Sequence, residues 1–156
     1  MTQIRLTRTE SELANWLAEK RYTESREAGI PDELAADRDP VENETYSFEA
    51  ELAVAKMLNI YPSFEDRVVG YDLTYVGYHL DVKFMPQGFM SVRADRDLSE
   101  KVYVGVMEIG PWLYDVVGWI AGKEVQKLPA RRGVRPGAPP WYFVKAKTLK
   151  TNWNWA

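Results

Sequence analysis

Two short β-prone segments on either side of a glycine constrain the fold of this chain more than any other feature. Residues 71–76 and 78–84 are rich in aromatic and β-branched side chains, and Gly77 stands between them. This arrangement predicts a β-hairpin with a tight turn. The hairpin marks the point at which the chain changes from helical to strand character.

Three polar residues of this hairpin are expected to share one face. Side chains alternate along a strand, so Asp81 and Lys83 point to the same side. If the loop consists of residues 76–77, Asp72 lies directly opposite Asp81. If it consists of residues 77–78, the same aspartate lies opposite Lys83 and diagonal to the second acid. Both two-residue loops bring the two carboxylates and the lysine together, whereas a three-residue loop would separate them.

The first part of the chain is predicted to be helical. Residues 9–28 carry apolar side chains at helical spacing, and Thr9 or Ser11 can cap the start of this helix. A second helix is expected over residues 46–59, with Ser47 as its cap. The acidic, proline-containing segment between the two helices is expected to be irregular.

Strands dominate the second half of the chain. Apolar runs at residues 102–109 and 113–120 predict two strands, and residues 141–144 predict a last one. Residues 131–140 contain two glycines and three prolines and are expected to form a loop. Two helices followed by mainly antiparallel strands indicate an α+β or mixed α/β fold, with a central mixed β-sheet and flanking helices.

The paired carboxylates of the hairpin suggest a metal site. Like charges that face one another across two strands are destabilising, so Asp72 and Asp81 need a compensating positive charge. Lys83 supplies part of it, and carboxylate oxygens are the ligands that Mg²⁺ prefers. An ordinary solvated face with one Asp–Lys pair is the alternative that spacing alone leaves open.

A carboxylate on the second helix supports the metal site. At about 100° per residue, Glu51 falls between Ala55 and Leu58 in the apolar stripe. Glu49 falls beside Lys56 on the polar side, where a carboxylate needs no partner. A carboxylate that faces a core is costly unless it is paired or bound to a metal. Glu51 is therefore expected to have a partner, and a metal held by the hairpin acids would be one.

These segments resemble the PD-(D/E)XK nuclease superfamily. The resemblance lies in residues 70–73, Gly-Tyr-Asp-Leu, followed by residues 80–83, Leu-Asp-Val-Lys. The family pattern has an acid at the start of one strand and acid-x-Lys on the next. The helix with Glu51 is similar to the first core helix of the family, and the strand at residues 116–120 is similar to those of small phage-encoded members. The chain departs from the pattern at Tyr71, where the family usually has proline.

The resemblance implies a fold and a domain organisation. A restriction-endonuclease-like core would span residues 46–149 of a single nuclease-like domain that covers residues 1–156. Residues 1–45 would form an N-terminal helical extension, which matches nothing in the family pattern.

The resemblance also implies metal-dependent hydrolysis of DNA phosphodiester bonds. The catalytic residues would be Glu51, Asp72, Asp81 and Lys83. One or two Mg²⁺ ions, for which Mn²⁺ can substitute, would be held by the two aspartates, the carbonyl of Val82 and Glu51. Lys83 would orient the attacking water or neutralise developing charge. The alternative is a catalytically inactive module of the same fold that binds DNA or protein. Endonuclease and exonuclease action are both left open.

The distribution of charge gives a further hint of a polyanionic partner. The net charge is −3, yet residues 121–156 hold eight basic side chains and a single acidic one, Glu124. This basic segment could bind nucleic acid, or it could neutralise the acidic first half of the chain. The substrate-binding candidates are arginines near the hairpin or in the glycine- and proline-rich loop: Arg93, Arg131, Arg132 and Arg135.

Composition narrows the cellular context. The chain has no cysteine, which excludes disulfides, thiolate metal sites and thiol nucleophiles. No stretch approaches the roughly 20 apolar residues of a membrane span, and the first residues lack the apolar segment of a signal peptide. A cytoplasmic protein is expected, in the host cytoplasm if it is phage-encoded, with DNA as its partner and with a homodimer left open.

Overall fold

A computed structural model describes residues 2–29, 39–60, 72–133 and 136–154. The helices and strands in this part of the chain follow one another in the order β1 (Thr2–Arg5), α1 (Arg8–Glu27), α2 (Pro40–Leu58), β2 (Leu73–Tyr75), β3 (Tyr78–Phe84), β4 (Phe89–Arg93), β5 (Lys101–Gly110), β6 (Leu113–Ala121), α3 (Gly122–Val125) and β7 (Trp141–Lys145), with a 3₁₀ turn at Ala146–Thr148.

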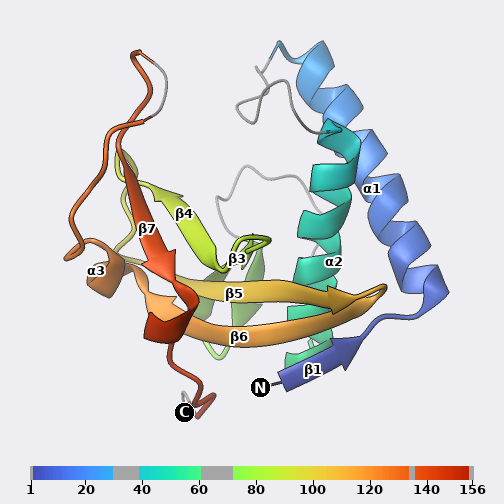
Figure 1. Cartoon of the computed structure of the whole chain (residues 1–156). Coiled ribbons are helices and arrows are strands. Elements are labelled where there is room, and N and C mark those ends of the chain that lie inside the picture. Colours follow the sequence, from blue (N-terminus) through green and yellow to red (C-terminus); the bar gives the residue numbers. More distant parts are fainter. Residues whose placement is uncertain (1, 30–38, 61–71, 134–135, 155–156) are drawn as a thin grey trace.

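The strands form a curled five-stranded sheet and a separate two-stranded sheet (Figure 1). The large sheet has the order β1-β6-β5-β3-β2, and the small one pairs β4 with β7. β3 and β5 run parallel, whereas the other neighbours in both sheets are antiparallel. The expected mixed α+β class with a mixed sheet is therefore confirmed.

Two hydrophobic cores lie on the two faces of the large sheet. α1 and α2 pack together on one side (Figure 1), and the core between these helices and the sheet includes Leu80, Val82 and Val104. The second core, beneath β4 and β7, includes Met90 and Tyr103. Because β3 alternates between the two faces, each face of this strand meets a different layer. None of the helices in the described ranges is both long enough and apolar enough to cross a membrane.

The helix boundaries correct two sequence predictions. α1 lies within one residue of the expected range, but its cap is Thr7, whose hydroxyl accepts from the Glu10 N–H at 3.1 Å. α2 begins six residues before the expected position 46. Its cap is Asp39, and the proline that follows suits the first turn of a helix because no N–H is needed there. Ser47 is not a cap, since it lies inside the helix and donates to the Asn43 carbonyl at 3.1 Å.

The hairpin turns through residues 76–77, the first of the two loops compatible with its sequence. The pairing of Leu73 with Leu80 and of Tyr75 with Tyr78 leaves Val76 and Gly77 as the loop. Both loop residues have positive φ, 49° and 81°, as a type I′ turn requires. β2 starts at Leu73, so the expected strand was too long at its N-terminal side; residue 71 lies outside the described ranges.

Two strands were missed by the sequence analysis. β1 pairs with β6 at one edge of the large sheet, and α1 packs against α2, so residues 2–27 join the same layers as the rest of the chain. β4 pairs with β7. Both missed strands are short, and a run of four or five residues carries little periodic signal.

Candidate active site

The centre of the candidate site lies along β3, next to Asp72, the residue that precedes the start of β2. There the Asp72 N–H donates to the Leu80 carbonyl at 2.8 Å, and the Val82 N–H donates to Asp72 Oδ2 at 2.7 Å. A side-chain carboxylate thus takes the place of a backbone acceptor on a neighbouring strand. This geometry holds Asp72 against β3 close to the position of Asp81.

Glu51 reaches this region from α2. Its side chain is buried, as the helical periodicity predicted, with an exposed fraction of 4%. Burial raises the pKa of the Glu51 carboxyl well above its usual value, and the neighbouring charge of Asp72 raises it further. Arg21 on α1 opposes this increase, while Asp81 adds a smaller increase. Glu51 and the two hairpin acids therefore form one electrostatic unit.

The pKa of Asp72 is also raised, and by similar causes. Burial and then the charge of Asp81 raise its pKa from 3.8 to about 6, although the Val82 N–H, Lys83 and Arg21 oppose the rise. Desolvation and repulsion outweigh one hydrogen bond and two cations. A cation bound beside Asp72 would oppose both the desolvation and the repulsion.

Asp81 is held between two lysines. Lys83 Nζ lies 3.0 Å from Asp81 Oδ1, and Lys101 Nζ lies 3.6 Å from Oδ2. Lys101 comes from β5, which runs parallel to β3 and pairs Tyr103 with Asp81. The expected convergence of Asp72, Asp81 and Lys83 is present, and Lys101 is a member that the sequence analysis missed.

The donor atoms of this site suit a hard divalent cation. Mg²⁺ binds carboxylate oxygens and is usually held by one or two carboxylates together with water and substrate phosphates. Asp72 and Asp81 supply two such groups, and Glu51 adds a third at longer range. In the described ranges, no three acidic or histidine side chains lie close enough together to hold an ion without such help. A metal ion here would therefore be bound by two carboxylates, with water or phosphate as its remaining ligands.

A pocket of about 170 Å³ lies on the Asp81 side of β3. Besides Asp81 and Lys83, its lining includes Lys101, Arg93 and Arg96. Arg93 Nη2 binds Asp95 Oδ2 at 2.7 Å, whereas Arg96 forms no ion pair with any residue in the described part of the chain. One expected substrate-binding residue, Arg93, thus lies in the same pocket as two expected catalytic residues.

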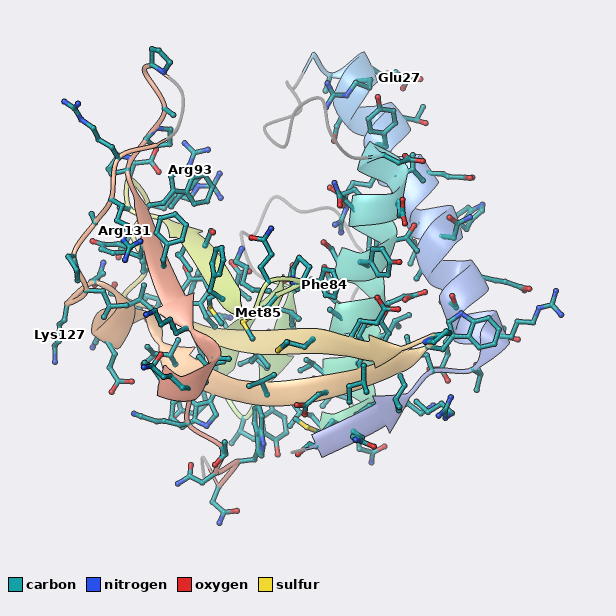
Figure 2. All side chains as sticks on the ribbon, viewed as in Figure 1. Glu27, Phe84, Met85, Arg93, Lys127 and Arg131 are labelled. Atoms are coloured by element: carbon teal, nitrogen blue, oxygen red, sulfur yellow. The ribbon has the colours of Figure 1, made fainter. Side chains whose placement is uncertain are left out.

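The remaining arginine candidates divide into three cases. Arg131 forms an isolated bridge with Trp141, which pairs on its other side with Arg93, so these two arginines flank one tryptophan. Figure 2 shows both of them on the side of the small sheet away from α1 and α2. Arg132 is exposed and does not line the pocket. Arg135 lies outside the described residues.

Glu49 corrects the sequence analysis. It is buried, with an exposed fraction of 5%, and it does not lie on a solvated face beside Lys56. Ser11 Oγ donates to Glu49 Oε1 at 2.5 Å, and the Tyr114 hydroxyl donates to Oε2. α2 is covered by α1 as well as by the sheet, so a helix wheel with one buried stripe was too simple.

A second cavity is unsuited to a polyanion. It measures about 670 Å³ and lies between α2 and the turn that joins β5 to β6. Among the described residues, five carboxylates and no basic side chain line it: Glu19, Asp39, Glu42, Glu49 and Glu108. Repulsion would keep phosphate out, so the small basic pocket is the better phosphate site despite its size.

Two further residues of the site carry no clear signal in the sequence. Arg21 lies on α1, binds Glu44 at 3.1 Å and lies over the Phe48 ring at 3.7 Å. Arg96 follows β4 in a short acidic and basic segment. Both reach the site only because distant elements pack together, as does Lys101.

No relative of this chain emerges from comparison with known proteins: no protein-family model matches it, and neither a curated protein nor a solved structure is significantly similar to it. Any functional assignment therefore rests on the geometry of the site.

Proposed function

We propose that this protein is a metal-dependent nuclease that hydrolyses DNA phosphodiester bonds. The observation that carries the proposal is the electrostatic unit of Glu51, Asp72 and Asp81, in which burial and mutual repulsion raise the pKa of two carboxyls. Perturbed carboxyls that converge from different elements are typical of functional sites. Lys83, at 3.0 Å from Asp81, adds the cation that such a site uses toward phosphate.

The proposal includes the restriction-endonuclease-like core inferred from the sequence. Its members would be α2 with Glu51, the β2–β3 hairpin with Asp72, Asp81 and Lys83, and the strands β5 and β6. The order of helix glutamate, hairpin acid and acid-x-Lys along these elements supports this assignment.

Each residue of the site would have a separate task. Asp72, oriented by the Val82 N–H, and Asp81 would bind Mg²⁺ or Mn²⁺, with Glu51 reaching the ion directly or through water. When bound, the ion supplies a water of lowered pKa and positive charge toward the phosphoryl oxygens. Lys83 would donate to a phosphate oxygen or to the attacking water, and its charge would stabilise the transition state.

A non-catalytic DNA-binding module is the second candidate. It is favoured by the basic lining of the pocket beside Asp81, to which Lys101, Arg93 and Arg96 contribute. Such a module would keep the basic pocket and would have no use for the metal. A titration with Mn²⁺ separates the two candidates, because only the nuclease needs the ion.

Cleavage of a panel of DNA substrates tests the proposal. Linear, single-stranded, branched and supercoiled DNA are incubated with the protein in Mg²⁺ or Mn²⁺, with EDTA and the Asp81→Asn variant as controls. Cleavage of at least one form, lost in both controls, is expected. Survival of every substrate would overturn the proposal, and so would cleavage that persists in the variant, which would indicate a contaminating nuclease.

A further inference from the structure

We infer that the basic pocket beside Asp81 binds a terminal phosphomonoester of a nucleic-acid strand. This inference deepens the proposed nuclease function, on which it rests for the identity of the substrate. It concerns a phosphate other than the one that is cleaved, and it assigns a role to residues outside the candidate catalytic group: Lys101, Arg93 and Arg96.

The charge of the pocket fits a phosphate with two negative charges. Four basic side chains line it, and Asp81 is the sole carboxylate among the described residues of the lining. Lys83 is paired with Asp81, and Arg93 is paired with Asp95. The positive charges of the other two basic side chains of the lining remain. A phosphomonoester carries about −1.5 to −2 at pH 7, whereas a phosphodiester inside a strand carries about −1. The pocket is therefore the better match for the end of a strand.

The pocket is too small to enclose more than the end of a single strand. At about 170 Å³ it has room for roughly five water molecules. This volume is below the range of pockets that enclose a whole drug-sized ligand. It admits a phosphate group with part of its sugar. Trp141 also lines the pocket, and an indole is a surface on which the terminal base can stack.

The basic side chains approach the pocket from separate elements. Lys101 Nζ, at the start of β5, is 3.6 Å from Asp81, and the Lys101 side chain is mostly buried, with 18% of its surface exposed. Arg93 ends β4, and Arg96 follows it without an ion pair in the described chain. Partial burial strengthens the interaction of Lys101 with an anion, and guanidinium groups bind phosphate with paired donors. Lys101 and Arg96 are therefore the residues expected to contribute most.

Binding in EDTA tests the inference without cleavage. Fluorescence anisotropy measures affinity for one short single-stranded oligodeoxynucleotide in three forms: with a 5′-phosphate, with a 3′-phosphate, and with neither. We expect one phosphorylated form to bind on the order of tenfold more tightly than the unphosphorylated form, because each charge-assisted contact contributes that much. Inorganic phosphate is expected to compete with that form more effectively than with the unphosphorylated one.

Two variants and a matched control locate the effect. Arg96→Gln and Lys101→Gln should abolish the preference for the phosphorylated form. Arg8→Gln removes the same charge from a side chain that is 79% exposed at the start of α1, and should keep the preference. Arg96 is exposed, so Arg96→Gln is expected to fold. If Lys101→Gln has a lowered melting temperature, the phosphate preference of Arg96→Gln alone tests the pocket.

Each outcome bears on one proposal separately. Equal binding of all three oligonucleotides, or a preference that survives Arg96→Gln, overturns the phosphate pocket even if the protein cleaves DNA. A preference lost in both variants supports the pocket even if no DNA substrate is cleaved, and in that case the nuclease proposal alone fails.

Discussion

Glu49 and Glu51 lie two residues apart on α2, and both are almost completely buried. Their surroundings differ sharply. Glu49 accepts hydrogen bonds from the hydroxyls of Ser11 and Tyr114, which are neutral donors. The charge of Asp72 and, to a smaller extent, that of Asp81 raise the pKa of Glu51, and Arg21 is the cation that most offsets their effect.

The two carboxylates differ in the charge of the groups that act on them. A buried carboxylate with hydrogen-bond donors on both oxygens has replaced its water, and it needs no ligand. A buried carboxylate whose pKa is raised by other carboxylates is stabilised by an added cation, as at Glu51 beside Asp72. Glu49 also lines the acidic cavity with Glu108, but hydroxyls donate to both of its oxygens, so its region is expected to be structural. The Glu51 region is the one expected to bind a cation. Four predictions test this division.

The largest expected effect is the loss of cleavage in Asp81→Asn. This variant removes one carboxylate of the site, and cleavage should fall on the order of 1000-fold. Isothermal titration should show weaker Mn²⁺ binding, while the melting temperature in EDTA should stay the same or rise, because repulsion with Asp72 is relieved. Lys83→Ala should also abolish cleavage and should keep Mn²⁺ binding, since an ammonium group is no metal ligand.

A large drop in the melting temperature of Asp81→Asn, together with unchanged Mn²⁺ affinity, would contradict this assignment. Asp81 and its two lysines would then be a structural ion-pair network.

Glu49→Ala should destabilise the fold by on the order of 3 kcal/mol without changing Mn²⁺ affinity. The variant removes two hydrogen bonds to a charged acceptor and leaves the buried hydroxyl of Tyr114 without that acceptor. Urea unfolding followed by circular dichroism measures the loss. If the variant has the stability of wild type but binds Mn²⁺ less well, Glu49 belongs to the functional site, and the distinction between Glu49 and Glu51 is wrong.

Asp72→Asn should make the metal-free protein less sensitive to pH. The folded-state pKa of Asp72 is raised to about 6, above the unfolded value of 3.8. Its protonated form therefore stabilises the fold fully below about pH 4, and this contribution is lost as the pH rises through 6. In EDTA, the variant should gain on the order of 2 kcal/mol relative to wild type between pH 4 and pH 7.

Asp95→Asn is a control with the opposite sign. The Arg93 guanidinium holds the pKa of Asp95 below its usual value, so its charged form stabilises the fold above about pH 4, and this contribution is lost only at lower pH. Asp95→Asn should therefore be less stable than wild type by a nearly constant amount between about pH 4 and pH 7. Parallel stability curves for wild type and Asp72→Asn would show that Asp72 is not strained by its neighbours.

The smallest expected effect is that of Ser11→Ala. It removes one of the two donors to Glu49, at 2.5 Å, while the Tyr114 hydroxyl remains. A loss on the order of 1 kcal/mol is expected in urea unfolding, well below that of Glu49→Ala. Equal losses in the two variants would mean that Ser11 alone satisfies Glu49.

Local patterns were sufficient for part of the fold and of the candidate site. α1 was predicted within one residue, and the hairpin was predicted with Gly77 in its turn. The burial of Glu51 followed from the 3.6-residue period of a helix. The error at the start of α2 also has a local cause. Asp39 and the proline after it form a normal helix start, and the prediction placed the start six residues later.

The amino-acid sequence by itself determined the features that depend on neighbours along the chain. Strand alternation brings Asp81 and Lys83 to one side of β3, and a two-residue turn brings Asp72 to the same strand. These relations span at most about ten residues, so the backbone geometry of one hairpin is enough to define them.

The tertiary structure alone decided which charges surround those residues. Lys101 reaches Asp81 because β5 pairs in parallel with β3, and Arg21 reaches Glu51 because α1 packs on α2. Glu49 is buried because a second helix covers the side that a wheel drawn for one helix leaves in water. Such contacts join residues far apart in sequence, and their geometry depends on the packing of whole layers, for which no local period exists.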